Sequence, residues 1–519
     1  MYVLGRRWQD GYLDYHRLAG EVRIQVRAWW PLEQLGDVFF EPPRSLRRLW
    51  GYWRSDGLRE VALKVHSRLR ERLRNRRFFC LGAGTVCETD PDSDLVLGAP
   101  VAFVAPCHPE CVERVCLPRS FVTAIAPELL ARVCRPEAIC LYSGAVPSAG
   151  PSWDDLAGWS PFSGTPVTDA VRRVLPWVVA HLGRREARDA RPLALPNPTP
   201  IQERAADSGV PRGELRAVLF GLGNYAKTII IPKIDPRIQI QCVHEIEPTQ
   251  MGTGRRRTWG YDTSGSFRAD ERYDVAFVAG YHHTHAPLAV HALRQGAWVV
   301  VEKPLVTTRT QLDDLLAALR LHPGKLYAGF QMRYNPLWRL ARKDLALAPG
   351  APVHYHCIVF ETPLVRRHWY HWPNSCSRIV SNGCHWLDHF LFMNDWSKPE
   401  RWRLTRARNG DIHVSLELDN GAAFSMSLTD HGSPRLGVDD HVELRANGVT
   451  VRVHRSGSYV AEDGYRILRR ARLKRLASHR RMYQTISQRI LNGQPGDSPE
   501  SVEQSGALML ALEECCRPS

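Results

Sequence analysis

No run of apolar residues in this chain of 519 residues approaches the roughly 18 that a membrane-spanning helix needs. The first residues also lack the apolar core of a signal peptide. The sequence has no internal repeat, and its 44% hydrophobic and 24% charged residues are unlike the composition of disordered, collagenous or coiled-coil chains. We therefore expect a soluble, cytoplasmic protein of two or three globular domains without membrane contact.

A regular cysteine framework is absent as well. The 13 cysteines are odd in number and irregularly spaced, which excludes the disulfide scaffold of small secreted proteins and predicts reduced thiols. Seven of them lie between Cys80 and Cys140. Because cysteines clustered in this way can bind zinc, a zinc site has to be considered in the first half of the chain.

Acidic residues are outnumbered, with 54 Asp and Glu against 69 Lys and Arg and a formal charge of +15. Such a charge permits nucleic acid, an acidic protein or an anionic metabolite as partner. The densest run, 466–481, holds eight Lys or Arg in 16 residues. No nucleic-acid module accompanies it, so a solvated helix face is the ordinary interpretation, and an acidic carrier protein stays open.

A proline-rich segment divides the chain. Residues 184–212 contain prolines at positions 192, 196, 198, 200 and 211 and show no helical or strand periodicity, which is typical of a linker. We expect one domain over 1–183, a second over 213–334 and a third over 335–519.

The second domain alternates apolar strands with helices. Continuous apolar runs at 215–220, 238–243, 273–279 and 298–301 are separated by helical stretches such as 287–295. Strands that are apolar throughout predict a parallel sheet covered on both faces.

The third domain shows period-2 alternation instead. Two pairs of alternating runs meet at Asn420-Gly421 and Asn447-Gly448, and Asn-Gly between such runs is a strong hairpin signal. We expect a largely antiparallel sheet there. Ser498 as N-cap and Pro499 at the first helical position predict that the chain closes on a helix.

A GxGxxA turn follows the first strand of the second domain and consists of Gly221, Leu222, Gly223, Asn224, Tyr225 and Ala226. Its two glycines permit a tight turn and a close approach to a pyrophosphate, and alanine permits close helix packing. Glu245 stands where a partner of a ribose hydroxyl belongs. An acid there favours NAD, although Glu247 could replace it and three arginines at 255–257 could accept NADP.

A lysine ends a later strand of the same domain. In VVVEKP at 299–304, Lys303 lies at the carboxyl edge of the sheet, where ligands bind in such folds. A lysine there can donate a proton or hydrogen bond to a substrate oxygen.

Taken in order, GLGNYA, FVAGYHHTHAPLAVHALRQGAWVVVEKPLVTT, GFQMRYNP and NGCHWLDHF resemble the Gfo/Idh/MocA oxidoreductases over about residues 214 to 515. The resemblance implies a Rossmann doubly wound parallel sheet followed by an α+β, mainly antiparallel domain that binds substrate and forms oligomers. It implies catalytic roles for Lys303 and His385. Ser381 stands where the family has an aspartate beside that histidine, which leaves base catalysis weaker.

The resemblance also implies further contacts. In the family the loop that holds His282 and His285 lies beside the nicotinamide, so we do not expect a metal there. Glu302 joins the expected cofactor contacts. The expected substrate contacts are Arg333, Trp369, Tyr370, His371 and Asp388.

The first domain resembles a β-rich GroES-like half of the zinc alcohol dehydrogenases, in the form fused to this family in bi-domain oxidoreductases. Only about 60 residues stand where the fusions carry a second nucleotide-binding domain. Cys107, Cys111 and Cys116 offer soft ligands, but the cysteine quartet of the dehydrogenases is absent, so zinc is not expected.

Three functional hypotheses follow. The first is an NAD(P)-dependent oxidoreductase that moves hydride between nicotinamide and a sugar-like, cyclitol, imine or ketone substrate in a biosynthetic pathway. The second is an imine reductase that acts on a carrier-bound intermediate. The third is a catalytically weak, cofactor-binding scaffold protein.

Overall fold

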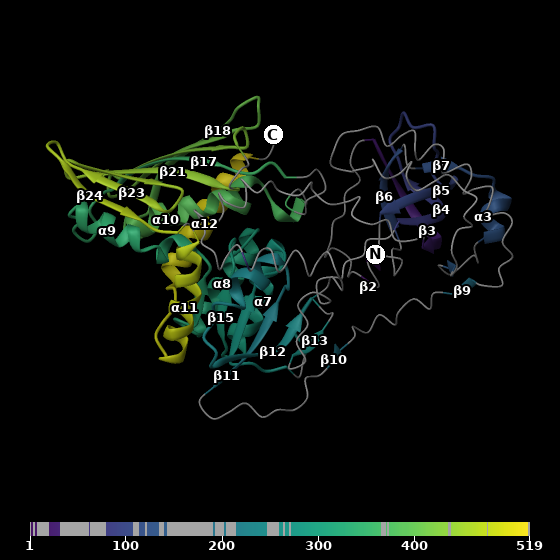
Figure 1. Cartoon of the computed structure of the whole chain (residues 1–519), viewed down its shortest axis with the longest axis horizontal. Coiled ribbons are helices and arrows are strands. Elements are labelled where there is room, and N and C mark those ends of the chain that lie inside the picture. The colour runs from purple at the N-terminus through teal and green to yellow at the C-terminus, as the bar shows by residue number, and fades with distance from the viewer. Residues whose placement is uncertain are drawn as a thin grey trace.

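A computed structural model of the chain contains three large sheets (Figure 1). It describes residues 2–3, 6–7, 20–31, 62, 79–106, 114–119, 122–133, 140–142, 190–192, 202–203, 214–245, 259–262, 265–268, 271–364, 370, 373–433, 437–474 and 476–516. Among these residues no helix is both long and apolar enough to cross a membrane.

The second domain is built on a parallel sheet, as predicted. Its strand order is β10-β13-β12-β11-β14-β15-β16, and only the short β10 runs antiparallel. The order reverses beside β11, which is the point where doubly wound folds bind ligands. The strands are β10 (Gln202–Glu203), β11 (Leu215–Phe220), β12 (Ile238–His244), β13 (Gly260–Asp262), β14 (Val275–Val278), β15 (Trp298–Val301) and β16 (Leu326–Ala328).

Two helices, α7 (His285–Arg294) and α8 (Arg309–Leu321), pack side by side in this domain. Thr308 caps α8 by accepting a hydrogen bond from the backbone N–H of Gln311. Leucines of α8 are buried in one apolar cluster with β14 and β15. The strands of this sheet are buried along almost their whole length, which explains their lack of alternation.

The helix after the glycine turn differs from the prediction. Its regular part is a π-helix of five residues, η3 (Ala226–Ile230), where we expected an ordinary helix. Three isoleucines in sequence, Ile229 to Ile231, crowd the backbone, and Pro232 follows directly. A β-branched run that ends in proline disfavours a longer α-helix.

The third domain is a sheet of eight strands in the order β18-β19-β20-β17-β21-β22-β23-β24. All its pairs are antiparallel except β17 with β20, so the largely antiparallel prediction is confirmed. Both Asn-Gly sites form the expected hairpins. The strands are β17 (His354–Phe360), β18 (Pro399–Arg406), β19 (Ile412–Leu418), β20 (Ala423–Thr429), β21 (Asp439–Ala446), β22 (Val449–His454), β23 (Ser458–Glu462) and β24 (Ile467–Arg472).

Four helices pack against the eight-stranded sheet or between the two domains. They are α9 (Pro336–Asp344), α10 (Cys384–Met393), α11 (Ala477–Leu491) and α12 (Pro499–Cys516). The last, α12, contacts both α8 and β18, and Figure 1 shows it running from the parallel-sheet domain toward the eight-stranded sheet. Ser498 accepts a hydrogen bond from the backbone N–H of Ser501, which agrees with its predicted N-cap role. The basic run 466–481 is not one helix face, because it spans β24 and the start of α11.

The first domain contains a sheet in the order β7-β5-β4-β3-β8-β9, with β6 paired to β3. This β-rich character agrees with the sequence, while the likeness to a GroES-like unit stays a prediction. Cys107 and Cys111 lie outside the described residues, and Cys116 lies in β6. The elements are β3 (Glu21–Pro31), β4 (Phe79–Glu88), β5 (Pro100–Pro106), β6 (Arg114–Pro118), β7 (Val122–Ala124), α3 (Pro127–Val133), β8 (Cys140–Tyr142) and β9 (Ala190–Pro192). The segment 184–212 thus holds two short strands, β9 and β10.

Candidate active site

The glycine turn connects β11 to η3 at the carboxyl edge of the parallel sheet. Gly221 has φ +91°, and a Cβ on it would lie 2.5 Å from the carbonyl oxygen of Ala279. Only glycine fits there. A Cβ on Gly223 would meet nothing within 4 Å, so the backbone of this residue faces open space. The turn therefore leaves room for a ligand against its second glycine.

Glu245 follows the end of β12 and lies against the glycine turn. One oxygen of its buried carboxylate accepts a hydrogen bond from the backbone N–H of Leu222 at 2.6 Å. The backbone N–H of Glu245 in turn donates to Asp262 in β13. The predicted acid and the turn are thus in direct contact, while Glu247 and residues 255–257 lie outside the described residues.

Lys303 lies just beyond the end of β15. Its Nζ donates a hydrogen bond to the main-chain oxygen of Ser381 at 2.8 Å and lies 5.9 Å from the centre of the Tyr370 ring. Burial disfavours the charge on Lys303, but Tyr370, Cys384 and Glu302 together hold its pKa above the usual value. The lysine therefore carries a proton at neutral pH.

His385 lies in the first turn of α10, four residues after Ser381. Ser381 itself belongs to a π-helical segment, η8 (Ile379–Gly383), that leads into α10. Burial lowers the pKa of His385 well below its usual value, and the charge of Lys303 lowers it further. Its Nδ1 is buried without a hydrogen-bond partner among the described residues. A buried ring nitrogen in this state is available to a bound ligand.

Two histidines after β14, His282 and His285, are buried and uncharged at neutral pH. Burial lowers the pKa of His285 to about 4, and its Nδ1 lies 2.7 Å from the main-chain oxygen of Pro304. His282 lies with its ring 4.8 Å from that of Tyr370, and burial also lowers its pKa. The ring of His285 thus contacts the chain segment that follows Lys303. His282 lies beside Tyr370, whose ring is close to Lys303.

A buried carboxylate connects Lys303 to α11. Glu302 accepts a hydrogen bond from the hydroxyl of Tyr483, and burial raises the pKa of Glu302. Tyr225 of the glycine turn also faces this pair, since its pKa is raised by burial and then by Glu302. This contact places α11 against both the glycine turn and the lysine segment.

Two of the predicted substrate residues bind each other instead of facing Lys303. Arg333 forms a two-pronged ion pair with Asp388 of α10, and a further guanidinium nitrogen pairs with Asp497. The side chains of Arg333 and Asp388 are 7% and 1% exposed. We interpret this pair as positioning α10. Trp369 and His371 lie outside the described residues, whereas Tyr370 contacts both Lys303 and His282.

Sequence reasoning missed Tyr483, Asp497 and Ser505. Ser505 of α12 donates a hydrogen bond to Asp388. All three lie on or between the last two helices, more than 90 residues from the partners they bind. A tyrosine on the apolar face of an amphipathic helix gives no local signal, so only long-range contacts identify these residues.

The residues present fit a bound dinucleotide. The open space at Gly223 and the buried acid Glu245 lie at the carboxyl edge of the parallel sheet. The ring of His385, whose Nδ1 has no partner among the residues described, lies 6.1 Å from that of Phe330, which follows β16. Gly221, Gly223 and Glu245 would hold the adenosine and pyrophosphate end. Lys303 and His385 would face the reacting end.

The amino-acid sequence matches one family, described as "Oxidoreductase family, NAD-binding Rossmann fold", over residues 215–330. A trans-1,2-dihydrobenzene-1,2-diol dehydrogenase of Xenopus laevis is 22% identical over 177 residues, or 33% of this chain and 52% of that protein. An oxidoreductase of Bacillus subtilis, YteT, is 36% identical over 66 residues, or 13% of this chain and 15% of that protein. The chain thus spans about half the length of the first curated relative and less of the second.

Solved structures are also similar to this chain. GenD2 from gentamicin A biosynthesis, in complex with NAD, is 18% identical with a TM-score of 0.48 and covers 60% of this chain and 95% of its own. KijD10, a 3-ketoreductase of Actinomadura kijaniata in complex with NADP and TDP-benzene, is 16% identical with a TM-score of 0.47. The match covers 57% of this chain and 96% of KijD10. Residues 215–330, the parallel-sheet domain, thus match the Gfo/Idh/MocA oxidoreductases, a family described by its NAD-binding Rossmann fold.

Proposed function

We propose that this chain is an NAD(P)-dependent oxidoreductase that transfers hydride between nicotinamide and a carbon of a sugar-like, cyclitol, imine or ketone substrate. The observation that carries the proposal is geometric: Lys303, just beyond β15, donates a hydrogen bond to the main-chain oxygen of Ser381, one turn before His385 of α10. The Nδ1 of His385 has no hydrogen-bond partner within the described part of the chain. The nicotinamide supplies or accepts the hydride. The residues of the chain bind and orient the substrate and hold its proton.

Lys303 is the donor in this arrangement. Its Nζ is fixed by the main-chain oxygen of Ser381, and an ammonium has further N–H groups to donate to a substrate oxygen or nitrogen. In the reductive direction a C–H bond forms at the substrate carbon and the C=O or C=N π bond breaks. The heteroatom then takes its proton from Lys303, directly or through His385. General acid catalysis of this kind contributes about 10²- to 10⁴-fold in rate.

The serine at position 381 favours reduction over oxidation. Oxidation of an alcohol needs a base that takes the hydroxyl proton, and a histidine is a stronger base beside a carboxylate. In this chain the residue one helical turn before His385 is Ser381, which carries no carboxylate. Burial also lowers the pKa of His385, so the histidine is a weak base. Reduction of an imine or ketone needs less base strength, so we rank this direction first. An acidic carrier that presents the substrate, and a homo-oligomeric assembly, remain part of the proposal.

Glu245 supports NAD as the preferred form of the cofactor. Its carboxylate accepts a hydrogen bond from the backbone N–H of Leu222 in the glycine turn, so it would lie beside the adenosine ribose of a bound dinucleotide and would repel a 2′-phosphate. Calorimetric titration of the full chain with NADH, and separately with NADPH, tests this preference. Failure to bind either would overturn the whole proposal.

Turnover is tested with three probes of different chemistry: D-glucose and myo-inositol with NAD⁺, and 2-methyl-1-pyrroline with NADH. Lys303→Met should bind NADH as the wild type does and lose turnover by at least about 10²-fold. Lys343→Met, an exposed lysine of α9, is the matched control and should keep full activity. Tight NADH binding together with unchanged turnover in Lys303→Met would favour the scaffold alternative and contradict catalysis.

A further inference from the structure

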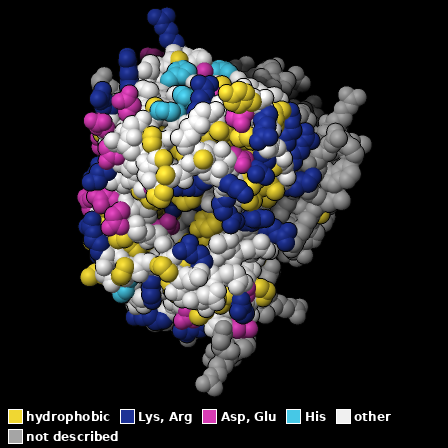
Figure 2. Space-filling model, turned by 90° about the vertical axis from the view of Figure 1, so that its left-hand side faces the viewer, with side chains coloured by type: hydrophobic (Ala, Val, Ile, Leu, Met, Phe, Trp, Pro, Cys, Tyr) yellow, Lys and Arg dark blue, Asp and Glu magenta, His cyan; other side chains and the backbone are white. Residues whose placement is uncertain are grey.

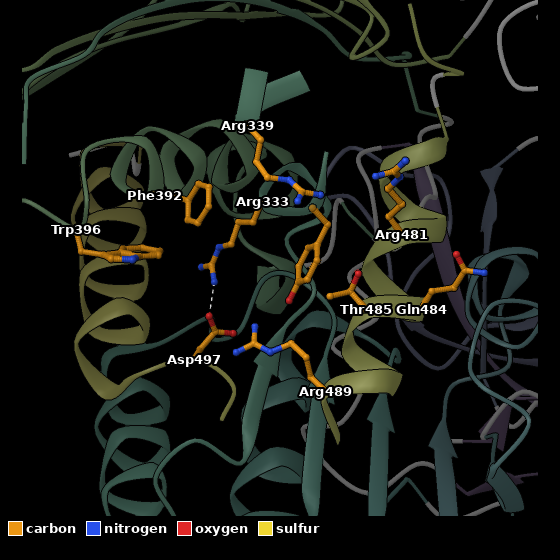
Figure 3. A pocket seen from close by; sticks show the side chains of 10 residues that line it. Arg333, Arg339, Phe392, Trp396, Arg481, Gln484, Thr485, Arg489 and Asp497 are labelled. Carbon is orange, nitrogen blue, oxygen red and sulfur yellow. Dashed lines mark hydrogen bonds and ion pairs between the residues drawn. The ribbon is translucent and has the colours of Figure 1, made fainter. Parts of the chain in front are cut away.

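The lining of a cavity of about 660 Å³ includes neither Lys303 nor His385, and Figure 3 shows this lining. The cavity is open to solvent and is lined by residues of η5 (Gln331–Tyr334), α9, the end of α10 and one face of α11. Figure 2 shows the face of the molecule where α9 and α11 lie, and Lys and Arg side chains gather there around a hollow. The charged residues that line the cavity are Arg333, Arg339, Arg481, Arg489 and Asp497.

The arginines in this lining are not neutralised by the one acid. Asp497 is already paired with Arg333, which Asp388 also binds. Within the described part of the chain, no carboxylate lies at ion-pair distance from Arg339, Arg481 or Arg489. Three positive charges in the lining of one concave surface attract a multivalent anion.

Two of these arginines, Arg339 and Arg481, are exposed to solvent and accessible to an anion. Arg339 comes from α9 and Arg481 from the first turn of α11, so two different elements contribute them. Arg489 is fixed further along α11, because it donates a hydrogen bond to the main-chain oxygen of Pro495 and its guanidinium lies 5.3 Å from the Tyr327 ring centre. A guanidinium fork suits phosphate oxygens better than a lysine does.

An aromatic wall faces the arginines. The ring centres of Phe392 and Trp396 lie 6.4 Å apart with the ring planes at 72°, so a base would pack against one ring and the edge of the other. The centre of the Trp396 ring lies 4.7 Å from the Arg333 guanidinium carbon. Trp396 has φ +64° and Asp395 has φ +51°. This left-handed conformation is rare for bulky residues and costs free energy. Two contacts of the Asp395 carboxylate stabilise this conformation: an ion pair with Arg342 and a hydrogen bond from the backbone N–H of Gly350. Such strain is typical of side chains that are held in place for a ligand.

We propose that this cavity is a second ligand site, for a nucleoside diphosphate or a molecule of that chemistry. The diphosphate would bind Arg339, Arg481 and Arg489, and the flat base would lie on the wall formed by Phe392 and Trp396. The volume is in the range of natural small-molecule sites, which is about 300–1,000 Å³. The hydroxyl and amide groups of Thr485 and Gln484 lie on the same lining, within reach of sugar hydroxyls.

This site is separated from the cofactor site by α11. Met482, Tyr483 and Ile486 are buried on the face of the helix that packs against the Rossmann domain. Arg481 and Arg489 belong to the cavity on the other face. Substitutions at the exposed arginines should therefore leave NADH binding intact.

Calorimetric titration of the full chain with UDP, in the presence of saturating NADH, tests the proposal. NADH keeps UDP from the cofactor site, so one equivalent of UDP should still bind. The double variant Arg339→Ala/Arg481→Ala should weaken UDP binding by at least about tenfold while NADH affinity stays unchanged. The matched control, Arg403→Ala/Arg408→Ala, removes two exposed arginines elsewhere and should bind UDP as the wild type does.

Separate titrations with uridine and with pyrophosphate examine the two halves of the site. Both should bind more weakly than UDP. Trp396→Ala should weaken UDP but leave pyrophosphate almost unchanged. Absence of saturable UDP binding, equal weakening in the control variant, or uridine binding as tightly as UDP would each overturn the proposal. Pyrophosphate binding as tightly as UDP would overturn the role of the aromatic wall.

Discussion

Replacement of Arg333 by leucine should destabilise the chain more than most single substitutions. Arg333 binds Asp388 and Asp497, and the three side chains are 7%, 1% and 15% exposed. Removal of one partner from a buried ion pair costs about 3–5 kcal/mol, because an uncompensated charge stays behind. For a folding unit of this size, about 2 °C is lost per kcal/mol. We expect the melting temperature to fall by about 6–10 °C.

The loss should depend on pH in a defined direction. Burial already raises the pKa of Asp388, although Arg333 opposes this effect. Without the guanidinium the pKa in the folded state rises further. Below the pKa of the unfolded chain, about 3.9, the aspartate is protonated in both states and the charge penalty vanishes. The penalty grows as pH rises toward the folded-state pKa and is largest above it.

Thermal denaturation at pH 5 and pH 8 measures this effect. The gap between wild type and Arg333→Leu should be wider at pH 8. The double variant Arg333→Leu/Asp388→Leu removes the stranded charge and should recover a large part of the lost stability. A loss below about 1 kcal/mol at pH 8, or a double variant no more stable than the single one, would refute the reasoning.

Three other predictions concern the candidate site and its supports. Glu245→Ala should raise the dissociation constant for NADH at least about tenfold in calorimetry, and unchanged affinity would contradict its role at the ribose. Tyr483→Phe removes one hydrogen-bond donor from buried Glu302 and should cost about 1.5–3 kcal/mol in chemical denaturation, whereas a neutral result would show that another donor replaces the hydroxyl. Burial alone would lower the pKa of His244, but its contacts with Cys242 and Glu271 raise it to about 9. Its stabilising effect should be complete below pH 6.5 and decline by up to about 3 kcal/mol as pH rises through 9, and Glu271→Gln should flatten that profile.

Local signals predicted the elements that carry the cofactor side of the site. The glycine turn, Glu245 and Lys303 each follow a buried strand, and parallel strands bring their carboxyl ends to one edge. The hairpins at Asn420 and Asn447 were equally predictable, because Asn-Gly fixes the turn regardless of the rest of the fold. In each case the signal is a short motif together with the strand beside it.

Other features depend on contacts that no local pattern contains. The basic run 466–481 appears as one charged stretch in the sequence, yet a strand ends and a helix begins inside it. Arg481 therefore lines a cavity with Arg333, which is distant in sequence. The π-helical segments at Ala226 and Ile379 were also missed, because an inserted helical residue changes no apolar periodicity over so short a stretch.

The position of α11 explains why these missed contacts matter for function. One face of the helix donates the Tyr483 hydroxyl to Glu302, the residue before the candidate catalytic Lys303. The other face contributes Arg481 and Arg489 to the arginine-lined cavity. A ligand that brings these arginines closer together would exert a force on α11. The buried face of the same helix contacts Glu302, the residue before Lys303. Two sites on one rigid element can influence each other only if the helix changes its position between ligand states. Comparison of NADH affinity with and without UDP in the wild type and in Tyr483→Phe would measure that coupling, because the variant cuts the contact through which it must pass.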